Sequence, residues 1–398
     1  MKKKWLKTLV VTGILTSFAV GGKLAHADTI NFSVNPIIPS NQANPQEGYF
    51  DLVLKPGEKQ TLQVALTNNT AKKITVETMI ASTTTNDAGQ VEYGPAQTKP
   101  DESLKYNLKD YVKAPAETVI EPKATVDVKF GVDMPTAAFQ GLMAGGITFQ
   151  QKPSELTDST KNQKGFAIKN QYQYIVAMLM RQQAGTVAPD LKLNGVTPSQ
   201  NNTRNIIAAN LQNPNMGYLN NMNVQADVKG VSDSSIHYTY HNEIMQMAPN
   251  SNFNLQVPVS QTGPLTGTYS KPLKAGKYQL AMTVYGQKDD NGKYAVKLST
   301  GQTVNYDYKW TFDKDFTISA STAAALNAKD TSIKHPKGIA WWLYAIGAVL
   351  LVVVILLIVL LLKRRKKEDK EADKEADLQA QLKAMQEELE QVKQDKER

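Results

Sequence analysis

The chain has 398 residues, 41% of them hydrophobic, and it contains no cysteine, which excludes thiol catalysis and thiolate metal sites. Without disulfides each domain must be stabilised by its hydrophobic core, and the length predicts two ordinary domains. The formal net charge of +8 comes mainly from five lysines in residues 1–27, because residues 28–362 hold 29 basic and 26 acidic residues and residues 363–398 hold 11 of each. The sequence therefore does not favour a nucleic-acid-binding protein.

Residues 1–27 have the composition of a secretory signal peptide. A lysine-rich start is followed by an apolar segment, residues 9–20, and by the typical cleavage sequence Ala25-His26-Ala27. The apolar segment is too short to span a bilayer. We therefore predict that residues 1–27 are removed on export, and the alternative is an uncleaved anchor.

Residues 28–155 have the pattern of short β-strands joined by turns. Hydrophobic and polar residues alternate in several runs, among them 62–66 and 126–132. This period of two is typical of strands with one face on a core. Turn-forming sequences such as Asp87-Ala88-Gly89 separate the runs, and together they predict a β-sandwich.

A polar segment, residues 153–164, follows and is either an exposed hairpin loop or a domain linker. We place the domain boundary there, because a new set of strands begins at 171–180, and a swap of this first strand close to the joint between the domains is one interpretation. Residues 165–320 repeat the alternation and predict a second β-sandwich. We expect both sandwiches to be immunoglobulin-like.

Four aromatic residues alternate along the last predicted strand: Tyr306, Tyr308, Trp310 and Phe312. A stripe of the sandwich core and a ligand platform are the two interpretations, and we favour the core stripe.

Residues 321–338 are expected to form a stalk, and residues 339–362 a transmembrane helix. These 24 apolar residues would form a helix of about 36 Å, enough to cross a bilayer. The basic cluster 363–367 predicts a cytoplasmic C-terminal end, so residues 28–338 would be an ectodomain outside the cell.

Residues 363–398 form the predicted cytoplasmic tail. Five apolar residues in it have the spacing 4, 3, 4, 3, as in a coiled-coil seam: Leu378, Leu382, Met385, Leu389 and Val392. A seam of about two and a half heptads is short for an isolated helix. The tail is therefore either a dimerising coiled coil or a solvated amphipathic helix, and the sequence favours neither.

The sequence offers no recognisable catalytic constellation. His237 and His241 have the spacing H-x-x-x-H but lack the glutamate of zinc proteases, and the alternating sequence around them predicts an exposed strand face. The glycines of segment 141–146 lack the lysine of a phosphate loop and predict a bend or a close backbone approach. We therefore expect no enzyme, no metal and no cofactor.

Several short segments match one protein family in their order and spacing. In the first predicted domain they include Gly48-Tyr49-Phe50-Asp51-Leu52, Met134-Pro135 and Phe139-Gln140-Gly141. In the second they include Leu211-Gln212-Asn213-Pro214, Met247-Ala248-Pro249-Asn250-Ser251-Asn252-Phe253 and Ala275-Gly276-Lys277-Tyr278. With the terminal anchor, they make the chain resemble the WxL-interacting proteins of Gram-positive bacteria over essentially the whole ectodomain and the membrane helix.

The resemblance implies a first domain that binds peptidoglycan, a second that binds a host ligand, and association with surface proteins that bear the WxL motif. The ectodomain has no WxL motif itself, as expected of the partner. We predict an adhesion or scaffold protein anchored in the cell membrane by one span, with peptidoglycan, a WxL protein and a host extracellular-matrix protein as partners. The alternative is a single-pass sensor that couples external binding to the tail, and a wall-modifying enzyme comes third.

Aromatic and amide side chains commonly bind sugars, so the candidates for glycan binding are Tyr93, Tyr106, Tyr111, Asn86 and Asn107. Ordinary loop tyrosines are the alternative. For the second domain the candidate partner-binding residues are Met247, Pro249, Asn250 and Ser251. Their sequence suits a turn, and a structural corner is the alternative.

Overall fold

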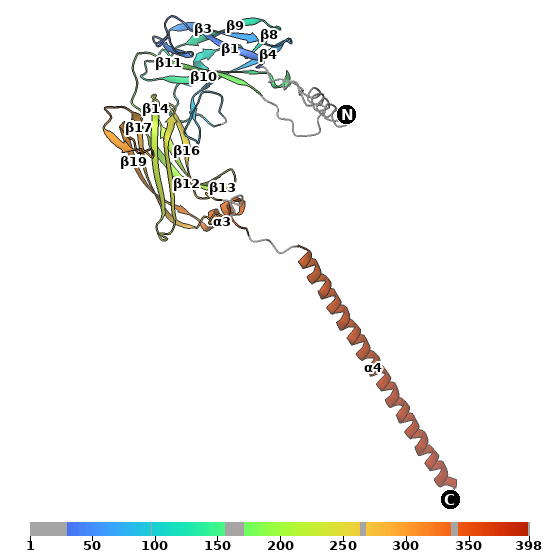
Figure 1. Ribbon diagram of the computed structural model, residues 1–398. Coiled ribbons are helices and arrows are strands. Elements are labelled where there is room, and N and C mark those ends of the chain that lie inside the picture. The colour runs from blue at the N-terminus through green and yellow to red at the C-terminus, as the bar shows by residue number, and fades with distance from the viewer. Residues whose placement is uncertain (1–29, 97, 156–170, 263–267, 336–340, 397–398) are drawn as a thin grey trace, which may run out of the picture. The chain divides into compact units, whose positions relative to one another are not determined.

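The computed structural model describes residues 30–96, 98–155, 171–262, 268–335 and 341–396 (Figure 1). The chain divides into a strand-rich unit that ends at Ile333 and a second unit, from Lys334, that holds the C-terminal helix. The predicted signal peptide, residues 1–27, lies outside the described residues.

The first β-domain consists of two sheets. One sheet has the order β1-β3-β9-β7, formed by β1 (Phe32–Ile37), β3 (Lys59–Asn68), β9 (Thr125–Asp133) and β7 (Val112–Lys113). The other has the order β2-β11-β10-β4-β8, formed by β2 (Phe50–Val53), β11 (Gln173–Arg181), β10 (Met143–Gln151), β4 (Ile74–Ser82) and β8 (Glu117–Ile120). Shorter elements are the hairpin of β5 (Thr84–Thr85) and β6 (Val91–Glu92), helix α2 (Leu108–Tyr111) and the 3-10 turn η1 (Pro153–Glu155).

The core of this domain lies between its two sheets. Alternate residues of β3 and β9 are buried, as the period of two predicts. Phe130 of β9 and Phe149 of β10 meet edge to face across the core, with ring centroids 6.0 Å apart.

Strand β11 belongs to the first β-domain, whereas we expected residues 171–180 to open the second. It pairs antiparallel with β10 and parallel with β2, and its alternate residues Val176, Met178 and Met180 are buried in the first core. The first β-domain therefore includes residues 173–181, beyond the expected boundary at 155. Alternation identifies a strand, but it does not identify the neighbour with which the strand pairs.

The second β-domain also consists of two sheets. The smaller has the order β12-β13-β16, formed by β12 (Lys192–Asn201), β13 (Arg204–Asn213) and β16 (Ser251–Pro258). The larger has the order β15-β14-β17-β19-β18, formed by β15 (His237–Met247), β14 (Leu219–Gly230), β17 (Gly276–Lys288), β19 (Thr303–Ile318) and β18 (Tyr294–Lys297). Trp310 and Phe312 of β19 pack against the core between these sheets, so the core-stripe interpretation is confirmed for these two residues. Tyr306 is buried in a separate small cluster with Val296 and Val304, and Tyr308 stacks on Trp310.

Helix α3 (Ala320–Lys329) replaces the first part of the expected stalk. The Ser319 hydroxyl accepts a hydrogen bond from the Thr322 N–H at 3.0 Å and caps the helix, while Ala323 is buried against the second core. Asp330 is fully buried. The expectation of a stalk from 321 is therefore wrong up to Ile333, because the segment is fixed by hydrogen bonds that hydrophobic periodicity does not reveal. Residues 336–340 lie outside the described residues.

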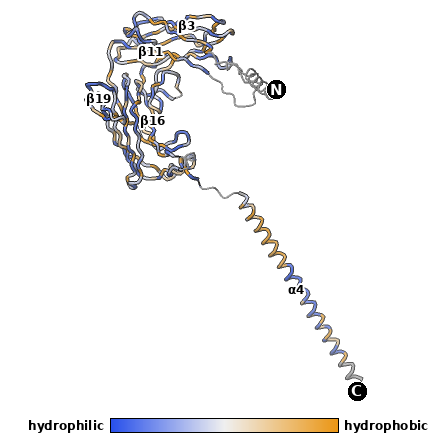
Figure 2. The backbone as a smooth tube through the Cα atoms, in the orientation of Figure 1, coloured by the Kyte–Doolittle hydropathy of each residue, from blue (hydrophilic) through white to orange (hydrophobic). Residues whose placement is uncertain are grey.

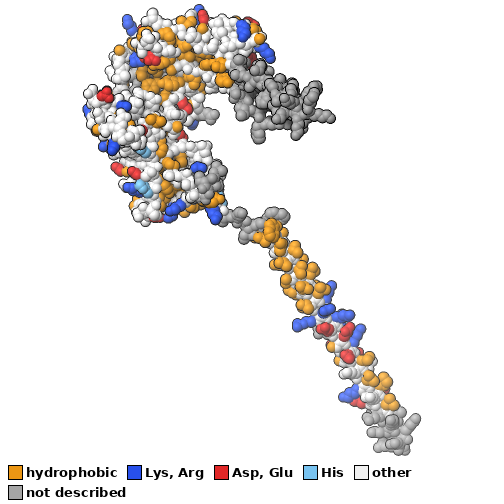
Figure 3. Space-filling model, in the orientation of Figure 1, with side chains coloured by type: hydrophobic (Ala, Val, Ile, Leu, Met, Phe, Trp, Pro, Cys, Tyr) orange, Lys and Arg blue, Asp and Glu red, His pale blue; other side chains and the backbone are white. Residues whose placement is uncertain are grey.

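The second unit contains helix α4 (Trp341–Lys396), which is continuous from the apolar segment into the charged tail. Figure 2 shows hydrophobic residues along its first part, and Figure 3 shows that charged side chains appear beyond this part, together with further hydrophobic ones. The first part is long and apolar enough to cross a membrane. Leu378, Leu382, Met385 and Leu389 are exposed in this single chain, so the choice between a coil and a solvated helix stays as predicted.

Candidate functional site

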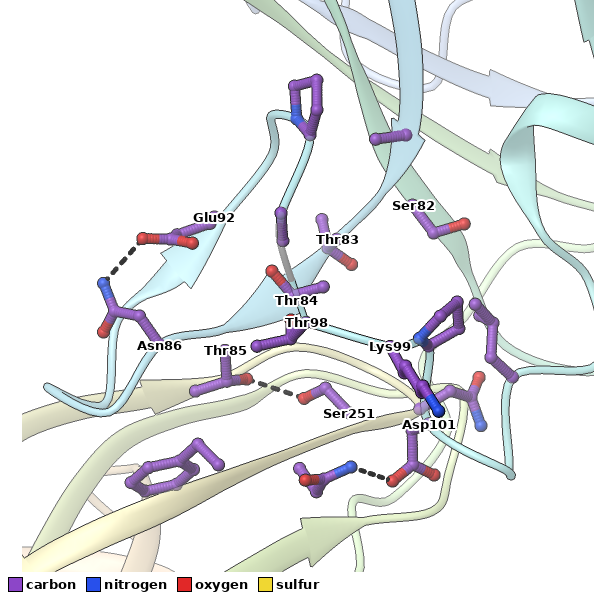
Figure 4. Close-up of a pocket in the computed structure, with 18 of the residues that line it drawn as sticks. Ser82, Thr83, Thr84, Thr85, Asn86, Glu92, Thr98, Lys99, Asp101 and Ser251 are labelled. Carbon is purple, nitrogen blue, oxygen red and sulfur yellow. Dashed lines mark hydrogen bonds between the residues drawn. The ribbon is translucent and has the colours of Figure 1, made fainter.

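A pocket of about 550 Å³ lies between the two β-domains (Figure 4). Its first-domain wall is formed by the end of β4, the β5–β6 hairpin and the chain that follows as far as Lys109. Its second-domain wall is formed by residues 250–254, where β16 begins. Both the volume and the position between domains are typical of ligand sites.

Hydroxyl and amide groups dominate the lining of this pocket. They come from Thr83, Thr84, Thr85, Thr98, Asn86, Asn107, Asn250, Ser251, Asn252 and Asn254. Charged groups of both signs accompany them: Asp87, Glu92, Asp101, Lys99 and Lys109. The hydroxyl oxygen of Thr84 is buried and has no hydrogen-bond partner among the described residues. The wall therefore includes one unsatisfied polar atom in surroundings suited to a neutral, hydroxyl-rich ligand.

A closed ring of three hydrogen bonds joins the domains beside the pocket. The Ala248 N–H donates to the Thr85 hydroxyl at 3.0 Å, and the Ser251 hydroxyl donates to the Ala248 carbonyl at 2.8 Å. Since the only hydrogen of Ser251 is used there, the Thr85 hydroxyl donates to Ser251 across 2.7 Å. Thr85 and Ser251 are both buried. Figure 4 shows the hydrogen bond between them as a dashed line.

Two carboxylates of the first domain accept hydrogen bonds from the second. Asp87 accepts from the Asn254 N–H at 3.0 Å and from the Gln256 amide at 3.1 Å. Asp101 accepts from the Gln212 amide at 2.8 Å and also from the Asn252 amide. These bonds connect the long 83–101 segment to β13 and β16.

The hydrogen bonds to Asp101 also change its acidity. Burial alone would raise the pKa of this carboxyl, but hydrogen bonds from the hydroxyl and N–H of Ser103 and from Asn252 and Gln212 outweigh it and lower the pKa below its ordinary value. The carboxylate is thus held in its charged form at the joint.

A pair of tyrosines forms a further contact of the joint. The Tyr218 hydroxyl donates to the Tyr93 hydroxyl at 3.2 Å, and burial raises the pKa of Tyr218. Nearby, the Leu142 N–H donates to the Met216 carbonyl at 2.8 Å. The joint therefore has contacts from two separate first-domain segments, 83–101 and the start of β10 at Leu142.

The structure brings together some of the glycan-binding candidates. Asn86 and Asn107 line the pocket, and Tyr93 lines a neighbouring groove. Tyr106 and Tyr111 contact each other, with ring centroids 6.0 Å apart, and both pack against the first core. These contacts fit the alternative that they are ordinary loop tyrosines.

Both asparagines already have structural contacts. The Asn86 side-chain oxygen accepts from the N–H groups of Ala88 and Gln90, which shapes the β5–β6 turn, and its amide donates to Glu92. The Asn107 oxygen accepts from the Ser82 hydroxyl at 3.2 Å.

The partner-binding candidates Met247, Pro249, Asn250 and Ser251 are all buried. They form the corner between β15 and β16 that packs on the first β-domain, and Asn250 has a left-handed φ of 48°. The expectation that they face a partner is not met in this structure, and the alternative of a structural corner fits their contacts. The hydrophobic and turn-forming residues of this segment form part of the contact between the two β-domains.

Sequence reasoning missed the first-domain residues that form the joint, chiefly Thr85, Asp87 and Asp101. Asp87 was noticed only as a turn former. The available signal was the length of segment 83–107, which is long for a connection between strands, but length does not single out any of these residues.

The two histidines lie on an exposed strand face, as predicted. His237 Nε2 is 2.7 Å from Asp227 Oδ1, and His241 Nε2 is 3.4 Å from Glu243 Oε1. Within the described part of the chain no group of three or more potential ligands is placed to hold a metal ion.

Comparison with known families agrees with this two-domain layout. The family model "WxL Interacting Protein, peptidoglycan binding domain" matches residues 32–151, and "WxL Interacting Protein, host binding domain" matches residues 163–328. The chain belongs to the WxL-interacting protein family. This WxL-interacting protein therefore has a peptidoglycan-binding domain followed by a host-binding domain. Strand β11 lies within the second match, although it pairs in the sheet of the first domain.

No curated protein matches the chain. Solved structures that resemble it slightly include a chaperone–tip adhesin complex of CFA/I fimbriae, with 11% identity, 70% of this chain and 100% of that chain covered, and a TM-score of 0.24. The Escherichia coli chaperone DraB has 14% identity, 71% and 98% coverage and a TM-score of 0.24. The CsuC–CsuE pre-assembly complex of Acinetobacter baumannii has 10% identity, 57% and 90% coverage and a TM-score of 0.26. Likeness at this level carries no argument about function.

Proposed function

We propose that this WxL-interacting protein is a membrane-anchored scaffold of the bacterial surface. Its first domain holds peptidoglycan, and its second presents a surface to a WxL protein or to a host matrix protein. The apolar part of α4 crosses the membrane once, with the β-domains outside and the tail in the cytoplasm. The observation that supports this most is the match of both domains to the family. We further propose that both two-sheet domains are immunoglobulin-like sandwiches.

The chemistry of the pocket between the β-domains supports a glycan ligand. Sugars of peptidoglycan present hydroxyl and acetamido groups, and the pocket is lined by groups that donate and accept hydrogen bonds without large net charge. We therefore assign part of the peptidoglycan contact to this pocket.

The proposal includes no catalysis. Asp87 and Asp101 are engaged by hydrogen bonds from the second domain, and Glu92 accepts from the Asn86 amide. Carboxylates occupied in this way suit a binding site better than acid–base chemistry, which needs a group free to exchange a proton with the substrate.

A co-sedimentation experiment tests the scaffold. Full-length protein in detergent is mixed with purified sacculi stripped of anionic wall polymers, and separately with an immobilised WxL-domain protein. We expect retention on both, competition by soluble peptidoglycan fragments on the first, and no release of sugar fragments from the sacculi. Absence of retention on stripped sacculi would contradict the peptidoglycan assignment. Release of sugar fragments would indicate a wall-modifying enzyme instead of a scaffold.

The continuity of α4 from the apolar segment into the tail favours a second function, that of a sensor. A rigid helix can transmit a change from outside to the tail. Deleting residues 378–398 separates the two functions, because a scaffold retains wall and partner binding whereas a sensor loses its cellular response.

A further inference from the structure

A second cavity, of about 610 Å³, lies on the outer face of the five-stranded sheet of the first β-domain. It is lined by residues of β4, β10 and β11 and by the 91–95 loop: Met79, Gln150, Gln173, Ile175, Ala177, Val91, Glu92, Tyr93, Gly94 and Pro95. We call this cavity the sheet-face groove.

The 91–95 loop rests directly on the sheet. A Cβ atom at Gly146 of β10 would lie 2.4 Å from the Tyr93 carbonyl oxygen, so only glycine allows this approach. This explains Gly146 in the glycine-rich segment 141–146, for which we predicted a bend or a close backbone approach. The loop thereby forms one side wall of the sheet-face groove and fixes Tyr93 above the strands.

One end of the sheet-face groove has a row of hydrogen-bonding side chains across three strands. The Gln150 amide of β10 donates to Glu77 of β4 at 2.9 Å, and the Gln173 amide of β11 donates to the Gln150 oxygen at 2.6 Å. Among the described residues the Gln173 oxygen has no partner, so an acceptor remains for a ligand at the exposed end of this row.

The floor of the sheet-face groove is apolar. Met79, Ile175 and Ala177 lie beyond the row, and the Ile175 side chain is 47% exposed. An apolar floor, a tyrosine wall and an amide row together match a ligand that alternates hydrophobic faces with hydroxyl and acetamido groups. The charged residues of the row and the wall, Glu77 and Glu92, are acidic, which disfavours polyanionic wall polymers.

The sheet-face groove and the pocket between the β-domains share a wall. Glu92 and Pro95 line both cavities, so the two adjoin at the 91–95 loop. Two adjoining cavities of similar size suit a polymer with a repeating unit better than a single small molecule.

We propose that the sheet-face groove and the pocket between the β-domains are neighbouring subsites for one peptidoglycan glycan strand, which passes over the 91–95 loop. This inference rests on the proposed function and assigns the groove side chains Gln173 and Ile175 to N-acetylated sugars. The strand itself is the ligand, and its stem peptides are not required for recognition.

Glycan strands freed of stem peptides and graded in length test the proposal. Their affinities for the full-length protein in detergent are measured by titration calorimetry, from the disaccharide to the octasaccharide. We expect the affinity to rise until the strand reaches both subsites. Gln173→Ala and Ile175→Ala should each weaken the binding of long strands by about three- to tenfold and reduce the gain with length.

Val119→Ala is the matched control, because Val119 lies on edge strand β8 of the same sheet and is 50% exposed, but does not line the groove. Equal affinities of wild type, Gln173→Ala and Ile175→Ala for long strands would overturn the groove assignment while leaving peptidoglycan binding intact. Failure of the wild type to bind any glycan strand or sacculus would instead remove the proposed function. Preferential binding of a poly(glycerol phosphate) over the glycan would also overturn the inference.

Discussion

The ring of hydrogen bonds between Thr85, Ala248 and Ser251 should control docking of the two β-domains. Thr85→Val keeps the side-chain volume but removes the hydroxyl that accepts from the Ala248 N–H and donates to Ser251. The Ala248 N–H is then left without an acceptor at a fully buried residue. An unsatisfied buried donor costs about 1–3 kcal/mol and the lost bond to Ser251 about 1 kcal/mol more, so docking should weaken by about 2–4 kcal/mol.

Hydrogen exchange at the Ala248 amide measures this effect directly. If the amide exchanges when the domains separate, a loss of about 2–4 kcal/mol lowers its protection by roughly 30- to 1,000-fold. Thr67→Val is the matched control, because the Thr67 hydroxyl pairs with Thr125 at 2.8 Å on an exposed surface of the same domain. Protection at Ala248 that falls no further in Thr85→Val than in this control would refute the reasoning.

Three more predictions concern the joint and the C-terminal end of the second domain. Gly89→Ala should loosen the joint by about 2 kcal/mol, because Gly89 has a φ of +70° and a Cβ there would meet Met245; faster exchange of the Gln246 amide, which donates to the Gly89 carbonyl, reports it. Gly57→Ala has a similar φ of +73° without a contact closer than 3.4 Å, and an equal effect at Gln246 would contradict the prediction. The pKa of Asp101 is lowered in the folded protein, so its contribution to docking of the domains is fully present above the unfolded pKa of about 3.9 and is lost as the pH falls through the folded pKa. Acid below about pH 4 should therefore separate the domains. Asp101→Asn should flatten the pH dependence of docking in hydrogen-exchange measurements. Asp330→Asn should release α3 by about 1–3 kcal/mol, because an amide group would face donors from Ser260, Asn205 or Ser332; unchanged resistance to proteolysis near Lys329 would count against it.

The same contacts show how far the sequence could predict the site. The sequence predicted Asn86 and Asn107 as exposed amide side chains that bind a glycan, and both line the pocket. No sequence pattern identified Asp101. Its role depends on Gln212 and Asn252, which lie more than a hundred positions further along the chain. Residues that act through such distant partners leave no local signature.

What the sequence determined by itself is the part of the molecule set by local pattern. Alternation predicted the strands of β3, β9 and β17, and the long apolar segment predicted the first part of α4, because burial of one face or of a whole segment imposes a period or a length on the residues there. The tertiary structure alone decided that β11 pairs with β2, that α3 packs on the second core, and that residues 247–251 form a buried corner. Each of these features depends on contacts between segments far apart in the chain. The free energy of such a contact depends on both segments, so the sequence of either segment alone does not predict it.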